Sequence, residues 1–165
     1  IPKEESKATA PGTPQMMPGL AQQTSGFTTP NWQPARHWET QDPGPMRKGR
    51  WNIARDNQKA EVTAAAFPGD VGGDLANVNR WLGQIGLSSI DAPTLEKQSL
   101  WVAIDGKTCR LLILYSDDTP QAIIAAIVPH QGSTWFFKLM GETALVLQEE
   151  AAFRAFLDSI HFDEA

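Results

Sequence analysis

The sequence lacks several features that would point to a particular class of protein. Its 165 residues include one cysteine, so an internal disulfide is excluded and the paired spacing of zinc and redox motifs is missing. Lysine and arginine total 14 against 19 aspartates and glutamates, a balance that disfavours nucleic-acid binding. The longest apolar run, residues 122–128, falls well short of the roughly 20 residues that cross a bilayer. We therefore expect no nucleic-acid partner and no transmembrane span.

Catalytic and metal-binding signatures are also missing. No histidine lies in an HxxxH or HExxH motif, and no GxSxG motif is present. The acidic pair at 117–118 is typical of an exposed turn rather than of acid/base catalysis. Cys109 alternates with apolar residues, which favours an inert buried thiol over a nucleophile paired with a distant histidine. We predict a protein that is not an enzyme and holds no metal or cofactor.

Proline, by contrast, is abundant at the N-terminus. Eight of the 12 prolines fall in the first 45 residues, among glutamine, serine, threonine and glycine. Such a segment buries too little apolar surface to offset a backbone entropy of about 1–2 kcal/mol per residue. We predict an extended arm or tether over residues 1–37 and a folded domain over residues 38–163. Because the sequence begins at Ile1, we expect that a preceding segment such as a signal peptide has been removed.

Hydrophobic periodicity predicts the elements of this domain. Alternating apolar residues predict six strands, at 46–54, 60–67, 100–105, 107–116, 121–129 and 134–139. Helical spacing predicts helices at 75–85 and 148–160, with a short helical turn at 93–98. Asp74 is expected to cap the first helix and Gly86 to end it, and the Asp105–Gly106 pair predicts a tight hairpin. The fold class is α+β, a mainly antiparallel sheet of about six strands covered by helices.

Three stretches carry a family resemblance, namely GGDLANVNRWLGQIGL at 72–87, TWFFKLMGE at 134–142 and FRAFLDSIHF at 153–162. Together they resemble a group of bacterial secreted proteins or lipoproteins with the PsbP-like α/β/α sandwich of the extrinsic photosystem II subunit and of eukaryotic Ran-binding proteins. The resemblance spans residues 38–162. It implies a non-catalytic accessory or binding module and supplies no catalytic residues.

A polar face of the first helix is the best candidate for partner binding. Asn77, Arg80 and Gln84 recur at helical spacing with Trp81 beside them, and arginine and tryptophan are enriched at binding hot spots. The alternative is internal: the polar side chains would satisfy loop carbonyls, and Trp81 would fill the space between helix and sheet.

The sequence is rich in tryptophan. Six tryptophans exceed ordinary usage, and each could pack in the core or contact a partner. Trp32 and Trp38 could anchor the arm or contact a partner. The run TWFFKL at 134–139 must show aromatic surface on both faces of its strand, so we expect the C-terminal helix to cover one face and the arm or a partner the other.

The glycine-rich segment GDVGGD at 69–74 joins a strand to a helix, where backbone amides can cradle phosphate. It has no lysine or arginine, and its two aspartates would repel an anion. A tight turn is the favoured interpretation, with an anion site and a calcium loop as alternatives.

Taken together, these features predict a non-catalytic accessory subunit or protein-binding module of a larger assembly. We expect it to be extracytoplasmic, either periplasmic or a membrane-tethered lipoprotein, and to contact a protein partner such as a membrane complex through its N-terminal arm. The alternative function is a small-ligand carrier with an apolar pocket between the sheet and the first helix, lined by Trp51, Trp81 or Trp101.

Overall fold

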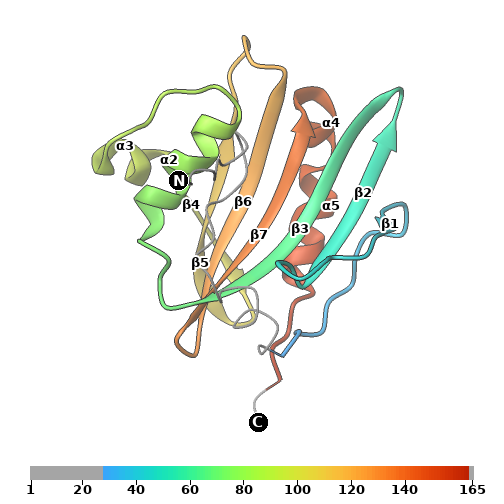
Figure 1. Cartoon of the computed structure of the whole chain (residues 1–165), viewed down its shortest axis with the longest axis vertical. Coiled ribbons are helices and arrows are strands. Elements are labelled where there is room, and N and C mark those ends of the chain that lie inside the picture. The colour runs from blue at the N-terminus through green and yellow to red at the C-terminus, as the bar shows by residue number, and fades with distance from the viewer. Residues whose placement is uncertain (1–27, 164–165) are drawn as a thin grey trace, which may run out of the picture.

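A computed structural model describes residues 28–163 of the chain, so residues 1–27 of the predicted arm lie outside the described part. Its centre is a seven-stranded sheet in which every neighbouring pair is antiparallel, in the order β1-β2-β3-β7-β6-β5-β4 (Figure 1). The strands are β1 (Glu39–Thr40), β2 (Gly49–Arg55), β3 (Gln58–Pro68), β4 (Leu100–Ile104), β5 (Lys107–Leu114), β6 (Gln121–His130) and β7 (Ser133–Glu142). The helices are α2 (Asp74–Gln84), α3 (Ala92–Gln98), α4 (Thr143–Gln148) and α5 (Glu150–Asp158). The predicted α+β class is confirmed.

Three tight turns set the register of the sheet, one of them formed by Gln131 and Gly132 between β6 and β7 with φ of 48° and 80°. Asp56 and Asn57 join β2 to β3 with φ of 54° and 66°, and Asp105 and Gly106 join β4 to β5 with φ of 51° and 77°. Positive φ at both central residues is the type I′ geometry, which matches the twist of an antiparallel hairpin. Because β3 then pairs with β7, the two halves of the sheet meet at its centre.

The ends of α2 are only partly as predicted. Gly86 has a φ of 82°, its N–H donates to the Gly83 carbonyl, and the Leu87 N–H donates to the Leu82 carbonyl, which is the glycine-terminated ending that the sequence predicts. The predicted cap at Asp74 is wrong. Gly73 occupies the cap position without a side-chain hydrogen bond, and the Asp74 carboxylate instead accepts from Arg110 at 2.9 Å.

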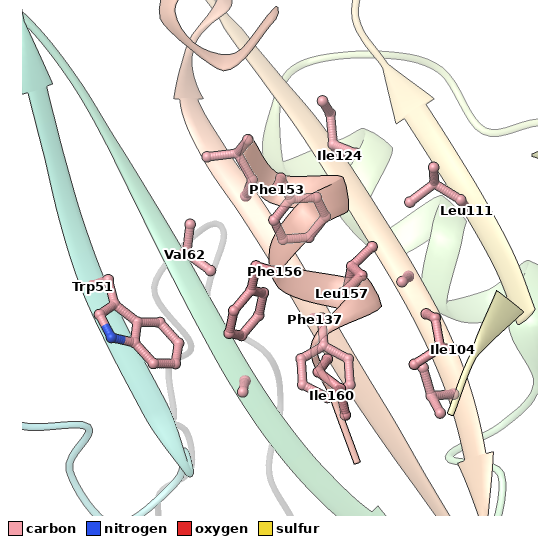
Figure 2. Packing of buried hydrophobic residues seen from close by; sticks show 14 of the residues in the cluster. Trp51, Val62, Ile104, Leu111, Ile124, Phe137, Phe153, Phe156, Leu157 and Ile160 are labelled. Atoms are coloured by element: carbon pink, nitrogen blue, oxygen red, sulfur yellow. The ribbon is translucent and has the colours of Figure 1, made fainter. Parts of the chain in front are cut away.

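One core lies between the sheet and the α4–α5 face. Phe156 and Phe153 of α5 point into it, against side chains from β2, β3 and β7 such as Trp51, Val62 and Phe137 (Figure 2). All of these side chains are at most 3% exposed. Where the sequence predicts one C-terminal helix at 148–160, the structure has two, α4 and α5, that meet at the buried residue Glu149.

A second core lies on the opposite face, beneath α2 and α3. Trp81 packs edge-on against Phe136 with ring centroids 5.3 Å apart, and Phe67 lies 5.9 Å from the same ring. The expectation that the arm or a partner covers this face of β7 is therefore wrong, since α2 covers it. Among residues 28–163, this core takes side chains from β5, β6 and β7 and from the C-terminal part of β3, which supplies Phe67, whereas β2 contributes none, and α2 and α3 lie over the β4–β6 side of the sheet (Figure 1). The sheet face is thus half covered.

Candidate binding surfaces

The predicted partner-binding residues of α2 divide into two groups. Asn77 is 1% exposed and Trp81 is 2% exposed, so both belong to the interior. The Asn77 amide donates to the carbonyls of Val71 and Gly73 at 3.2 and 2.7 Å. The internal alternative accounts for these two residues, because the amide fixes the loop before the helix and the indole fills the second core.

Arg80 and Gln84 lie on the same helix flank but are only partly buried. The Gln84 amide oxygen accepts a hydrogen bond of 3.0 Å from the Lys138 ammonium, which comes from the middle of β7. The ammonium also lies 5.8 Å from the centroid of the Trp81 ring. We call Arg80, Gln84 and Lys138 the Lys138 corner, because they meet where the covered half of the sheet face borders the uncovered half.

Lys138 is electrostatically unusual. Its pKa is lowered to about 8, chiefly by burial and also by the positive charges of Arg80 and Arg47, while Glu61 acts in the opposite direction. Sequence reasoning missed this residue. The available signal was a single lysine within the otherwise apolar strand sequence TWFFKLM, on the face that also carries Phe136.

The two predicted arm tryptophans pack on the domain itself. Trp32 contacts Trp51 edge-on with ring centroids 5.3 Å apart, and Trp38 is 5% exposed beside Phe156 at 5.5 Å. Backbone hydrogen bonds between Asn31 and His161 hold the same segment. Residues 28–38 therefore lie against the α5 face, and their two tryptophans complete the first core.

Glu149 joins this segment to the helices. Its carboxylate is 2% exposed and accepts from the Trp38 indole N–H at 2.9 Å, and one of its oxygens lies 2.8 Å from the His37 imidazole Nε2. The Arg55 guanidinium lies 3.6 Å away. A buried carboxylate with three partners is a structural clamp, because it satisfies the indole N–H that would otherwise be buried without an acceptor.

The edge strand β4 is the main exposed apolar feature. Leu100 is 41% exposed and Trp101 is 53% exposed. The Trp101 ring lies over the Arg110 guanidinium at 4.7 Å, and Arg110 is itself held by the Asp74 carboxylate. A groove of about 440 Å³ runs between β4 and α5, lined by Val102, Ala103, Arg154, Ala155, Leu157 and Asp158. This groove is not the pocket predicted for a ligand carrier, which would lie on the α2 side.

Within the described residues, the GDVGGD segment offers little support for the anion site or the calcium loop that the sequence left open. The GDVGGD carboxylates are engaged, since Asp70 accepts from the Gly72 N–H at 3.1 Å and Asp74 pairs with Arg110. Among residues 28–163, no cluster of three potential metal-ligating side chains is found. Within the same part of the chain, no helix has the length and apolarity to cross a bilayer.

Cys109 offers a direct test of the nucleophile alternative. Its side chain is 1% exposed, and burial raises the pKa of the thiol, although the positive charge of Lys107 acts in the opposite direction. Because the thiolate is the reactive form, we expect a disulfide reagent to label the native protein about 100-fold more slowly than the urea-unfolded chain. Absorbance of the released thiolate measures both rates. Fast stoichiometric labelling of the folded protein would revive the nucleophile alternative.

Comparison with known proteins yields similarity of structure rather than of sequence. No family model and no curated protein matches the sequence. Among solved structures, LpqN, involved in cell envelope biogenesis of Mycobacterium tuberculosis, is 15% identical with a TM-score of 0.48, over 82% of this chain and 84% of LpqN. Cyanobacterial PsbP of Synechocystis is 13% identical with a TM-score of 0.47, over 84% of this chain and 95% of PsbP. A protein of Bacteroides thetaiotaomicron is 9% identical with a TM-score of 0.44, over 81% of this chain and 44% of that protein. The likeness is one of fold.

Proposed function

We propose that the chain is a non-catalytic binding module that docks an extended segment of a protein partner onto the outer edge of β4. It serves as an accessory subunit outside the cytoplasm, as the three resembling sequence stretches imply. The observation that carries the docking edge is the position of β4 at the end of the sheet: within residues 28–163 it pairs only with β5, and it exposes Leu100 and Trp101.

Backbone geometry shows which groups of β4 are available. In a two-residue hairpin the residues that flank the turn exchange both of their hydrogen bonds, and this pairing recurs at every second residue. Ile104 pairs with Lys107 beside the turn, so Ile104, Val102 and Leu100 direct their backbone groups toward β5. Trp101 and Ala103 direct theirs outward. A partner strand could therefore form main-chain hydrogen bonds to these two residues.

The other edge of the sheet differs in a way that supports this assignment. β1 has only two residues, Glu39 and Thr40, and one of them is charged. Short, charged edges resist pairing with foreign strands, whereas β4 has five residues with no charge and no proline. Arg110 already holds the Trp101 ring in place, so less side-chain entropy is lost on docking. The adjoining groove can accept a partner side chain beside Leu157.

The predicted contact through the N-terminal arm is a separate proposal. The described part, residues 28–37, is engaged by the domain itself, so an arm contact would have to come from residues 1–27. We expect a chain beginning at Thr28 to keep the β4-dependent partner. Loss of that partner on this truncation would place the docking in the arm instead.

The docking edge is tested by site-specific photo-crosslinking in a native extract of the source organism. A photoreactive amino acid at position 101 is expected to give a defined adduct, and Ala103→Pro is expected to lower its yield at least about tenfold, because proline removes an outward N–H while the β5 ladder stays intact. The matched control carries the same amino acid at Tyr115, an exposed aromatic residue outside the strands.

Each outcome of that experiment decides something. An adduct at position 101 that is absent at position 115 and sensitive to Ala103→Pro supports the proposal, provided that circular dichroism shows the proline variant folded. An absent adduct, or one unaffected by the proline, contradicts it. An adduct of two copies of this chain would identify self-association through β4 and contradict a separate partner.

A further inference from the structure

The Lys138 corner combines charge and unused hydrogen-bonding capacity in a way that the docking edge does not explain. In the sheet register, Lys138 lies between Thr63 of β3 and Ala125 of β6. Both neighbours have small side chains, and the longer lysine side chain reaches the Gln84 amide on the flank of α2. The Lys138 corner therefore lies where the flank of α2 meets the middle of the sheet.

The charges around Lys138 are unbalanced. Among the described residues, Arg80 of α2 and Arg47, which precedes β2, act on it as positive charges, and Glu61 of β3 acts on it as a negative charge. Glu61 is already paired with Arg50 of β2 at 2.5 Å. Within residues 28–163, Arg80 forms no ion pair, and burial lowers the pKa of its guanidinium. Two partly buried cations thus share one corner without a dedicated counter-ion.

The same helix flank holds unsatisfied polar atoms. In the described part of the chain, the buried side-chain nitrogens and oxygens without a hydrogen-bond partner are Asn77 Oδ1, Arg80 Nε and Gln84 Nε2. Two of the three are donors beside Lys138. Buried polar groups are nearly always paired, so a cluster of exceptions indicates a place where an added group could be bound. An anion would supply acceptors to the donors and a counter-charge to both cations.

We infer that the Lys138 corner binds a small oxyanionic group, a carboxylate or a tetrahedral oxyanion, through Lys138 and Arg80 with Gln84 holding the lysine in position. The site is independent of the proposed function, because β4 lies at the far end of the sheet, beyond β6 and β5. Such a site has an energetic cost, because without an anion the charged Lys138 side chain is partly removed from water.

The test is titration of the full chain with sulfate and, separately, with succinate, at constant ionic strength with chloride as reference. Isothermal titration calorimetry and the midpoint of thermal unfolding are the readouts. We expect Lys138→Met and Arg80→Gln each to weaken binding about tenfold or more, because each removes a charge-assisted hydrogen bond. The matched control is Lys97→Met, the same change on the exposed last turn of α3.

The thermal stability of the variants distinguishes a ligand-binding Lys138 from a structural one. Burial of the ammonium destabilises the folded protein when no anion is bound. Lys138→Met is therefore expected to unfold at a temperature equal to or above that of the wild-type chain and to lose the stabilisation by anions. A structural lysine would instead give a lower unfolding temperature and an unchanged response. Lys97→Met is expected to change neither quantity.

The pH dependence provides a second readout. Sulfate keeps its charge across the neutral and mildly alkaline range, so the lysine dominates the change. Because the pKa of Lys138 is about 8, sulfate affinity is expected to fall as the ammonium loses its proton above that pH. Arg80 and Arg47 also face the lysine as positive charges and Glu61 as a negative charge, and the two arginines leave a reduced but measurable affinity.

The outcomes are distinct. A response to sulfate but not succinate assigns the site to tetrahedral oxyanions, and the reverse assigns it to carboxylates. Equal stabilisation of the wild type, Lys138→Met and Lys97→Met would mean only a general salt effect, which sulfate is known to exert on folded proteins, and would overturn the inference.

Discussion

Truncation of Phe156 to alanine is expected to lower the free energy of unfolding by about 3–5 kcal/mol, the range typical of buried phenylalanine. Phe156 is 1% exposed and stands where the arm segment, the sheet and α5 meet. Its ring centroid lies 5.8, 5.5 and 5.2 Å from those of Trp32, Trp38 and Trp51. Loss of the ring therefore opens a cavity among several stiff aromatic groups that cannot all move in to fill it.

Urea unfolding followed by tryptophan fluorescence and by circular dichroism measures this effect. The control is Tyr115→Ala, which also truncates an aromatic side chain but at a position that is 44% exposed, and it is expected to cost less than about 1 kcal/mol. A loss below about 1 kcal/mol for Phe156→Ala would show that the aromatic cluster does not hold residues 28–37 against the domain.

Much of the sheet is predictable because its signals are local. The Asp105–Gly106 pair can form a type I′ turn with little strain, and the hairpin of β4 and β5 follows from that pair and its flanking apolar residues. The end of α2 likewise depends on one glycine and the residue after it. In both cases the backbone geometry requires a particular residue type within two or three positions.

Elements defined by tertiary contact are not predictable in the same way. β1 has two residues and exists because Glu39 and Thr40 lie opposite β2, not because of a strand pattern. The α4 segment TALVLQ is too short for helical periodicity to emerge, so the sequence predicts no helix between the strand at 134–139 and residue 148. Similarly, Trp32 and Trp38 look like free anchors in the sequence, since nothing local shows that α5 offers them a site.

The candidate sites illustrate the same limit. Arg80 and Gln84 are found from helical spacing. Lys138 lies on a strand 54 residues after Gln84 and hydrogen-bonds to it. Only the pairing of β7 between β3 and β6 places the lysine beside α2. The exposed edge of β4 is equally a property of strand order, which follows from the packing of the whole sheet.

Glu149→Ala is expected to be the second strongly destabilising change, lowering the free energy of unfolding by about 3 kcal/mol, because it leaves a buried indole N–H without an acceptor and opens a cavity in the interior. The carboxylate is 2% exposed, while its partners His37 and Arg55 are 44% and 48% exposed. Those two can turn to water when the carboxylate is lost, so most of the cost comes from Trp38 and from the cavity.

Two variants distinguish these contributions by urea unfolding. Glu149→Gln keeps an amide oxygen for the Trp38 indole and is expected to cost only about 1 kcal/mol, near the net contribution of a hydrogen bond. Glu150→Ala is the matched control, the same residue type one position later, where it forms only a half-exposed pair with Arg154 and is expected to cost less than about 1 kcal/mol. If Glu149→Ala and Glu150→Ala cost the same, the buried carboxylate does not clamp the arm segment to α5. A large loss for Glu149→Gln would instead show that the negative charge, through His37 and Arg55, supplies most of the clamp.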